Sequence, residues 1–351
     1  MTARVRVAVD GAAGCITLDR PAALNALDLE MFEAVEDALV GWRDDPRVER
    51  VVVRGSGRAF SAGGDIRAVR AAAERRDERY LHALYRSEYG ANAIISAYPK
   101  PYVALVDGVC MGGGMGLAIH GSHRVVTQNA LLAMPETAIG FFPDIGCTYV
   151  FPRLPHRAGW FLGTTGSRMD AADALWCGLA THFIERGALG ECERRLISES
   201  STDGVLSSFA QRAPASSLAE HAGALARCFA GPELRDVLAA LSSDPTPWAQ
   251  ETLAMLERMS PSALIVTWAL FERGARMTLP ECLAMEFYAG RRMIDAPDFA
   301  EGVRAAVIDK DRRPVWSPRT FAEVDVAALT AMVDASARDA TAPGGTGVLR
   351  G

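Results

Sequence analysis

Residues 100–146 read KPYVALVDGVCMGGGMGLAIHGSHRVVTQNALLAMPETAIGFFPDIG. The apolar, β-prone run Tyr102–Val106 predicts a buried strand, and three consecutive glycines, Gly112–Gly114, follow it. Glycine lets the backbone approach a ligand closely, and the apolar run Met115–His120 after the glycines favours a helix. The glycines would then lie at a helix start, where free N–H groups and the helix dipole favour developing negative charge.

Two acidic residues, Glu136 and Asp144, each directly follow a proline in the apolar second half of this stretch. Carboxylates are unusual in such Pro- and Gly-rich apolar surroundings. We interpret the segment as an oxyanion hole that faces a pair of acids. Each feature also has a simpler reading: glycine clusters occur in tight packing, Glu136 could open a helix, and Asp144 could be a turn acid.

The overall composition excludes several classes of protein. Of the 351 residues, 49% are hydrophobic and 23% are charged, and the net charge is −6 with a pI near 5.6. This balance provides no basic field for nucleic acid or an acidic membrane surface, and no apolar run reaches the ~18–20 residues of a spanning helix. The first residues, MTARVRVAVDG, enter a strand pattern without a presequence signature, so we expect a cytoplasmic protein.

The seven cysteines are widely spaced, and none forms a CxxC pair. We therefore expect small buried hydrophobic side chains in a reducing compartment, with neither disulfides nor a metal site. Cys147 follows the glycine that closes the quoted stretch, and it is the cysteine that could act as a nucleophile. No basic residue in its local sequence would favour the thiolate, which argues against that role.

Strand and helix patterns alternate in the first half of the chain. We predict a hairpin at 5–18, helices at 29–42, 67–79 and 79–98, and strands at 50–54, 102–106, 124–126 and 131–133. This alternation implies an α/β architecture with mostly parallel strands, whose ligand sites lie at the carboxyl ends of the strands. A second glycine loop, GSGRAFSAGGDI at residues 55–66, follows one of these strands.

The second half of the chain is predicted to be helical. We expect three parts: a core at residues 1–197, a helical region at 198–340 and a flexible tail at 341–351. A Ser-rich stretch at 198–208 reads as a loop, and Ser260 with Pro261 reads as a helix start. The other predicted helices are at 171–177, 187–199, 220–230, 232–241, 248–259 and 279–293.

Long motifs in both halves resemble the enoyl-CoA hydratase/isomerase (crotonase) superfamily. In the first half they are GRAFSAGGDI at 57–66, KPYVALVDGVCMGGGMGL at 100–117 and AMPETAIGFFPDIG at 133–146. In the second half, RMSPSALIVT, LAMEF and DFAEGVRAAVIDKDRRPVWSP, which begin at residues 258, 283 and 298, are similar to the 3-hydroxyisobutyryl-CoA hydrolase branch. The resemblance implies a spiral of ββα units followed by a helical C-terminal region. It also implies an acyl-CoA substrate, no separate cofactor because CoA is part of that substrate, and a trimer-type homo-oligomer.

The resemblance also implies roles for residues at matching positions. The backbone N–H groups of Gly64 and Gly113 would be the two donors of an oxyanion hole for the thioester carbonyl. Glu136 and Asp144 would be the catalytic acids, and Glu88 would complete the acyl pocket. Gly113, Glu88 and both catalytic acids would contact the substrate.

One position separates the two main chemistries of this superfamily. Hydratases carry a first glutamate where this chain has Gly116, and a second where it has Glu136. The resemblance therefore favours hydrolysis of a short-chain 3-hydroxyacyl-CoA thioester, 3-hydroxyisobutyryl-CoA of valine breakdown in the first place. Glu136 would attack the carbonyl or activate water, while Asp144 would contact the 3-hydroxyl or position water.

Alternatives to hydrolysis are an enoyl-CoA hydratase or isomerase on the same fold and a catalytically silent acyl-CoA-binding protein. A dinucleotide-dependent enzyme is disfavoured because GGGMG lacks the GxGxxG pattern. Arg58 and Arg67 lie on either side of the glycines at 63 and 64 and are candidates for contact with CoA phosphates. We expect His120 and His123 to be structural. Cys147 replaces the glycine usual in the hydrolase branch, which affects the expected acyl specificity more than the reaction class.

Overall fold

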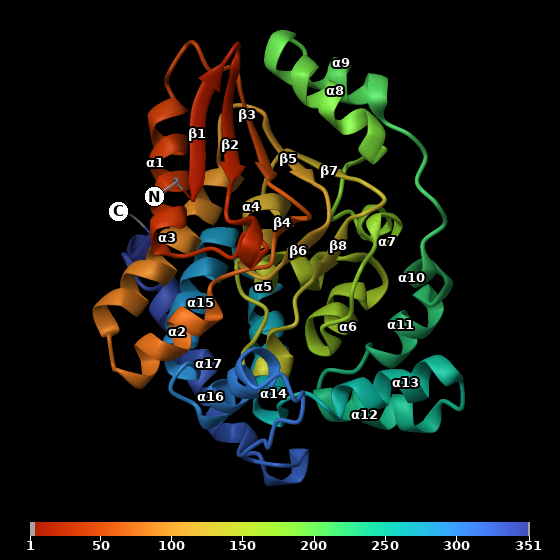
Figure 1. Ribbon diagram of the computed structural model, residues 1–351. Helices are drawn as coiled ribbons and strands as arrows, with labels where there is room; N and C mark the ends of the chain where they lie inside the picture. The colour runs from red at the N-terminus through yellow and green to blue at the C-terminus, as the bar shows by residue number, and fades with distance from the viewer. Residues whose placement is uncertain (1–3, 350–351) are drawn as a thin grey trace. The chain divides into compact units, whose positions relative to one another are not determined.

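The computed structural model describes residues 4–349, and these residues form two compact units (Figure 1). The described part of the first unit contains residues 4–65, 90–133 and 168–219. The second contains residues 66–89, 134–167 and 220–349. Each unit is therefore assembled from three separate stretches of chain, a division that the sequence patterns do not reveal. The part boundaries expected at residues 197 and 340 stay a prediction.

All strands of the described residues belong to the first unit and form two sheets. The larger sheet has the order β1-β2-β3-β5-β7-β9 and is parallel except for the antiparallel pair β1–β2. The smaller sheet, β4-β6-β8, is wholly parallel. The strands are β1 (Val5–Asp10), β2 (Ala13–Leu18), β3 (Arg50–Gly55), β4 (Ala59–Ser61), β5 (Tyr102–Val106), β6 (Val109–Met111), β7 (His123–Val126), β8 (Leu131–Ala133) and β9 (His182–Phe183).

From β3 to β9, consecutive strands alternate between the two sheets, which produces a spiral. Strands β3, β5 and β7 join the larger sheet, and the strand after each of them joins the smaller one. Gly108 makes the tight turn from β5 to β6 with a φ of +90°, and a Cβ there would lie 2.1 Å from the Arg58 carbonyl oxygen. Only glycine fits such a position. These repeats confirm the predicted α/β fold.

Two helices cover one face of the larger sheet in the first unit. Leu189, Cys192 and Leu196 of α8 (Arg186–Ser198) pack with Val205 and Leu206 of α9 (Thr202–Phe209) against buried strand residues. The other helices of this unit are α1 (Leu29–Trp42), the last turns of α3 (Glu78–Ser96), α4 (Gly113–Ile119), α7 (Ala171–Trp176), α10 (Ser217–Glu220) and the 3-10 helix η1 (Pro21–Ala23).

The buried Arg50 of β3 ties this sheet to the end of α8. Its guanidinium donates to the carbonyl oxygens of Leu196 at 2.5 Å, of Ser200 at 2.6 Å and of Glu199. These carbonyl groups belong to the last turn of α8 and to the two residues after it. Such groups have no N–H donor inside the helix. The cation therefore satisfies the helix terminus from within the core.

The second unit is helical in its described residues. Its α-helices are α2 (Ile66–Glu74), the first turns of α3, α5 (Cys147–Val150), α6 (Ala158–Thr165), α11 (Ala222–Cys228), α12 (Leu234–Ser243), α13 (Pro247–Leu256), α14 (Pro261–Gly274), α15 (Leu279–Met293), α16 (Pro297–Val303) and α17 (Val326–Thr341). A π-helical turn, η5 (Arg304–Ile308), follows α16. The 3-10 helices are η2 (Glu136–Ile139), η3 (Phe151–Arg153), η4 (Pro155–Arg157), η6 (Phe321–Glu323) and η7 (Gly345–Leu349).

Many helices were predicted close to their observed bounds, and others were missed. Ser260 caps α14 by accepting a hydrogen bond from the Ala263 N–H at 3.1 Å, as expected. The loop predicted at 198–208 is wrong, because Ser201 caps α9 and the apolar residues of α9 are buried. Helices α6, α16 and α17 were not predicted. The expected tail contains η7, whose Gly345 carbonyl accepts a hydrogen bond from Tyr288 at 3.2 Å.

Within residues 4–349, none of the helices combines the length and the apolar character needed to cross a lipid bilayer.

Candidate active site

The first unit leaves one backbone N–H group unused in the loop after β4. The N–H groups of Ala62 and Asp65 donate to the carbonyls of Leu24 and Leu27 at 2.9 and 2.7 Å. The Gly63 N–H donates to the Ser61 hydroxyl at 3.2 Å. No acceptor within the described residues takes the Gly64 N–H, and a Cβ built on Gly64 would meet nothing within 4 Å. Gly64 therefore presents a donor beside open space.

The second candidate donor, Gly113, is the first residue of α4. A residue at this position has no acceptor inside its own helix. The preceding Gly112 has a φ of +47°, and its N–H donates to the Ala133 carbonyl at 3.3 Å. The two loops touch: a Cβ on Gly63 would lie 3.0 Å from the Met111 carbonyl oxygen and 3.5 Å from the Gly113 nitrogen. The first unit therefore brings the two predicted glycines close together.

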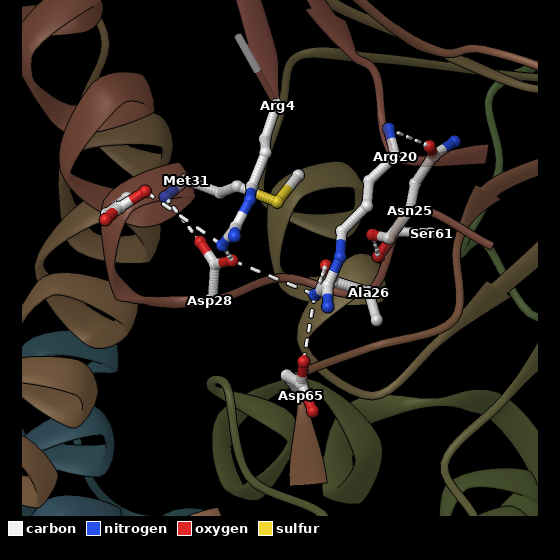
Figure 2. A network of polar contacts seen from close by, with 9 residues as sticks. Arg4, Arg20, Asn25, Ala26, Asp28, Met31, Ser61 and Asp65 are labelled. Atoms are coloured by element: carbon white, nitrogen blue, oxygen red, sulfur yellow. Dashed lines mark hydrogen bonds and ion pairs between the residues drawn. The ribbon is translucent and has the colours of Figure 1, made fainter. Parts of the chain in front are cut away.

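A network of polar side chains fixes the Gly64 loop (Figure 2). The Arg20 guanidinium donates to Asp65 at 2.9 Å and to the Ala26 carbonyl at 3.1 Å. The Arg20 backbone N–H donates to the Asn25 side-chain oxygen at 2.9 Å. Asp28 pairs with Arg4 and accepts a hydrogen bond from the backbone N–H of α1 residue Met31 at 3.1 Å. These side-chain hydrogen bonds fix the loop without using the Gly64 N–H group, which stays available as a donor.

The buried Asn25 contributes most of the remaining bonds. It lies in the left-handed region with a φ of +56°, which asparagine tolerates better than most residues. Its side-chain amide donates to the carbonyls of Ala59 at 2.8 Å and Phe60 at 3.2 Å, and its own carbonyl accepts from Ser61 at 2.9 Å. The sequence analysis did not identify Asn25 as a structural residue, although an Asn in a connecting segment is a turn signal.

The second unit gathers four buried carboxyl groups. Glu136 opens η2, Asp144 lies in the turn before α5, Glu88 lies on α3 and Glu286 lies on α15. Their exposed fractions are 9%, 7%, 6% and 0%, respectively. Within the described residues, none of the four forms an ion pair with Arg, Lys or His, and the Glu136 Oε2 atom is buried without a hydrogen-bond partner. The three predicted acids are therefore brought together, with Glu286 as a fourth.

Burial without a counter-cation raises the proton affinity of this cluster. Burial and the charge of Asp144 raise the pKa of Glu88 and of Glu136 well above the usual range. Burial raises the pKa of Asp144 to about 6, although a hydrogen bond from Tyr89 at 2.7 Å opposes the shift. Burial also raises the pKa of Glu286 to about 8. Such groups can accept or deliver protons near neutral pH.

The sequence reading did not identify Glu286 as a site residue. Its oxygens accept hydrogen bonds from the Gly146 N–H at 2.7 Å and the Thr148 N–H at 3.0 Å, and from the Thr148 hydroxyl at 2.6 Å. Glu286 lies inside the LAMEF motif that carried part of the family resemblance. The motif was therefore a signal for this residue, but its partners lie about 140 residues earlier in the chain.

Other candidate residues have structural environments. Burial and the neighbouring acids raise the pKa of the Cys147 thiol, which disfavours a thiolate nucleophile. His123 contacts Asp203 at 2.8 Å and Ser122 at 2.9 Å, so it links β7 to α9. Arg58 and Arg67 are exposed, and their contact with CoA phosphates stays a prediction. The expectation that the glycine N–H groups face the acids also stays a prediction.

The fold and these residues define a class of protein. A family described as enoyl-CoA hydratase/isomerase matches residues 13–333, so the chain belongs to that family. A curated relative from Xenopus tropicalis, "3-hydroxyisobutyryl-CoA hydrolase, mitochondrial", is 41% identical over 325 residues, which cover 90% of this chain and 84% of the relative.

Two solved structures are similar over nearly the whole chain. A carnitinyl-CoA dehydratase from Mycobacterium thermoresistibile is 37% identical with a TM-score of 0.90, covering 94% of this chain and 96% of that one. An enoyl-CoA hydratase from Rhodobacter sphaeroides is 39% identical with a TM-score of 0.87, covering 95% and 99% of the two chains. These similarities confirm the crotonase-like fold and its helical C-terminal region.

The prediction of a cytoplasmic location is wrong by the same comparison. The relative from Xenopus tropicalis is named a mitochondrial enzyme, which contradicts the prediction. The prediction rested on a presequence pattern that the first residues lack, and such an absence carries no information about location.

Proposed function

We propose that this protein hydrolyses short-chain 3-hydroxyacyl-CoA thioesters, with 3-hydroxyisobutyryl-CoA as the first substrate to test. The relative that shares 41% identity over 90% of the chain carries the name of that activity. The observation that carries the proposal is the makeup of the acid cluster. Gly116 stands where a hydratase has its first glutamate, whereas Glu88 and Asp144 join Glu136 in one buried group.

The chemistry of thioester hydrolysis needs an oxyanion donor and a base. In this proposal the Gly64 and Gly113 N–H groups bind the carbonyl oxygen as it becomes negative, which for each donor contributes about 10²–10³ in rate. The C–S bond breaks after oxygen attacks the carbonyl carbon, and CoA leaves as a thiolate that takes a proton. No metal and no separate cofactor take part.

Glu136 supplies the attack by one of two routes. As a nucleophile its carboxylate forms an anhydride that water then cleaves, and as a general base it removes a proton from the attacking water. Asp144 binds the 3-hydroxyl group or the water, and Glu88 lines the acyl pocket. The raised pKa values of these carboxyl groups make one of them available as the proton donor to the thiolate.

A second function, hydration or dehydration of an enoyl-CoA, is favoured by the names of the two similar solved structures. That reaction would use Glu136 and a second acid other than residue 116. A carboxyl group from the same cluster, such as Glu88, would then have to replace the missing glutamate.

The decisive experiment offers 3-hydroxyisobutyryl-CoA and crotonyl-CoA to the protein in parallel. Hydrolysis releases free thiol from the first substrate, and hydration removes the conjugated enoyl absorbance of the second. We expect thiol release to dominate; loss of enoyl absorbance without thiol release would establish the second function. Binding of both esters without either reaction would show a silent binding protein.

The two routes for Glu136 are separated by a single turnover in oxygen-18 water. Hydrolysis of an anhydride by attack at the enzyme carbonyl places the label in the Glu136 carboxyl group, which mass spectrometry of the peptide detects. Direct attack of water places the label only in the product acid.

A further inference from the structure

Glu286 is a completely buried carboxyl group to which the proposed reaction assigns no role. Its exposed fraction is 0%, and both of its oxygens accept hydrogen bonds. Burial of a carboxyl group costs free energy, so a buried acid that accepts three hydrogen bonds is expected to have a specific role. All three donors come from one short segment, which begins two residues after Asp144.

That segment has an unusual backbone. Ile145 has a φ of +54° and Gly146 a φ of +84°, so two consecutive residues lie in the left-handed region. For a β-branched residue such as Ile145 this conformation is rare and persists only where the surroundings impose it. The Cys147 N–H closes the turn onto the Asp144 carbonyl at 2.9 Å. The direction of the Asp144 side chain therefore depends on an otherwise unfavourable turn.

We propose that Glu286 is a positioning residue, which holds the turn of residues 144–148 so that Asp144 presents its carboxylate to the substrate. The inference rests on the proposed function, because it assigns Asp144 to the reaction. Glu286 binds the two N–H groups on either side of Cys147 at once, and Tyr89 fixes Asp144 itself at 2.7 Å. The turn and its acid are thus held from α15 and α3 within the second unit.

The isosteric variant Glu286→Gln tests this arrangement. The amide keeps the volume of the side chain but replaces one acceptor oxygen by an NH₂ group, which would face a backbone N–H donor. We expect kcat for thiol release from 3-hydroxyisobutyryl-CoA to fall about 10²-fold, because a displacement of about 1 Å has that effect on a positioned group. KM should change by less than about threefold, since the residue does not touch the substrate.

The matched control is Asp173→Asn in the first unit. Asp173 is also buried, with an exposed fraction of 5%, and accepts hydrogen bonds from the Ser216 hydroxyl at 2.6 Å and the Leu218 N–H at 2.9 Å. It belongs to a different unit from the four acids. Both variants replace a buried carboxyl group by an amide, so a kcat for Glu286→Gln equal to that of Asp173→Asn would overturn the proposal.

A milder variant covers failure of Glu286→Gln to fold. Thr148→Val removes one of the three hydrogen bonds and leaves both N–H donors. We expect a smaller loss of kcat that still exceeds the loss in Asp173→Asn. A value equal to the control would count against positioning.

A second readout does not depend on turnover. The carboxyl carbon of Asp144 is observed by NMR in protein labelled at aspartate and assigned by its loss in Asp144→Asn. We expect this signal to shift and broaden in Glu286→Gln and to stay unchanged in Asp173→Asn; an unchanged signal in both would overturn the inference. Absence of thiol release by the unmodified protein would instead refute the proposed function alone, and the NMR comparison would still decide the role of Glu286.

Discussion

The acids beside the Gly64 loop and the four clustered acids of the second unit are held in opposite ways. In the first unit, Asp28 and Asp65 pair with Arg4 and Arg20 around the Gly64 loop (Figure 2). In the second, none of the four clustered carboxyl groups pairs with a basic side chain among the described residues. Paired acids shape a backbone, whereas unpaired buried acids keep a raised pKa and remain reactive.

The contrast extends to the backbone. Around the Gly64 loop the acidic side chains are paired, and the candidate donors are the backbone N–H groups of Gly64 and Gly113. In the acid cluster of the second unit, the Oε2 atom of Glu136 is a buried acceptor without a partner among the described residues. A reaction that develops negative charge and moves a proton needs one group of each kind. The predictions below test the role of each of these groups.

The largest effect is expected for Glu136→Gln. The amide can neither attack the thioester nor take a proton, so thiol release should fall about 10³-fold or more. Affinity for the CoA ester should be retained, because the side chain keeps its size. Stopped thiol assays and calorimetric titration measure the two quantities, and near-normal turnover would remove Glu136 from the mechanism.

A loss of about 10²–10³ in kcat is expected for Gly113→Pro. Proline is tolerated at the first position of a helix and lacks the N–H group that the proposal requires. Gly113→Ala is the matched control, because it adds a Cβ and keeps the N–H group. Equal rates for the two variants would show that Gly113 is not an oxyanion donor.

The charge of Asp144 should lower stability as the pH rises. Its pKa is about 6 in the folded protein against an ordinary value of 3.8, so the folded state binds its proton more tightly than the unfolded state does. The resulting stability is fully present below pH 4 and is lost as the pH rises to about 6, by about 3 kcal/mol. Asp144→Asn should therefore unfold at a higher temperature than the wild type at pH 7 but not at pH 4. A constant difference between the two proteins across this range would contradict the assignment.

A smaller effect on the pH profile is expected for Tyr89→Phe. The Tyr89 hydroxyl donates to Asp144 and lowers the pKa of that carboxyl group. Without this bond the pKa rises, so the acid limb of the kcat profile should move to higher pH if Asp144 acts as a carboxylate. An unmoved acid limb would show that another group controls it.

The smallest effect is expected in the paired region. Arg20→Ala removes the bonds to Asp65 and the Ala26 carbonyl and should lower the free energy of unfolding by about 1 kcal/mol. The rate should fall only a few-fold, through loosening of the Gly64 loop. Arg47→Ala, which breaks the exposed pair with Asp45, is the control and should change neither quantity. A larger loss of rate in Arg20→Ala than in Gly113→Pro would reverse the comparison.

Sequence reasoning succeeded where a local pattern carries the physics. The helix at 279–293 was predicted with the observed bounds, and the structure shows that Thr278 and Glu281 form a capping box at its start. The strands Tyr102–Val106 and Leu131–Ala133 were also predicted with their observed bounds. The motifs around the glycines and prolines led to the family, which the comparisons confirm.

It failed where the contacts come from distant parts of the chain. Glu286 acquires its partners only when α15 packs beside residues 146–148, and no local pattern marks that approach. Helix α9 lies in a Ser-rich stretch whose composition favours a loop, and burial of Val205 and Leu206 against the sheet decides otherwise.

Arg50 has a consequence for how inherited changes in such a protein would show themselves. Its guanidinium joins the sheet to the end of α8 through carbonyl groups alone, remote from any proposed role in the reaction. A substitution of Arg50 should lower the amount of folded protein in the cell without changing the activity of each folded molecule. A substitution of Glu136 should do the reverse, so that antibody staining and enzymatic assay would disagree for one variant and agree for the other.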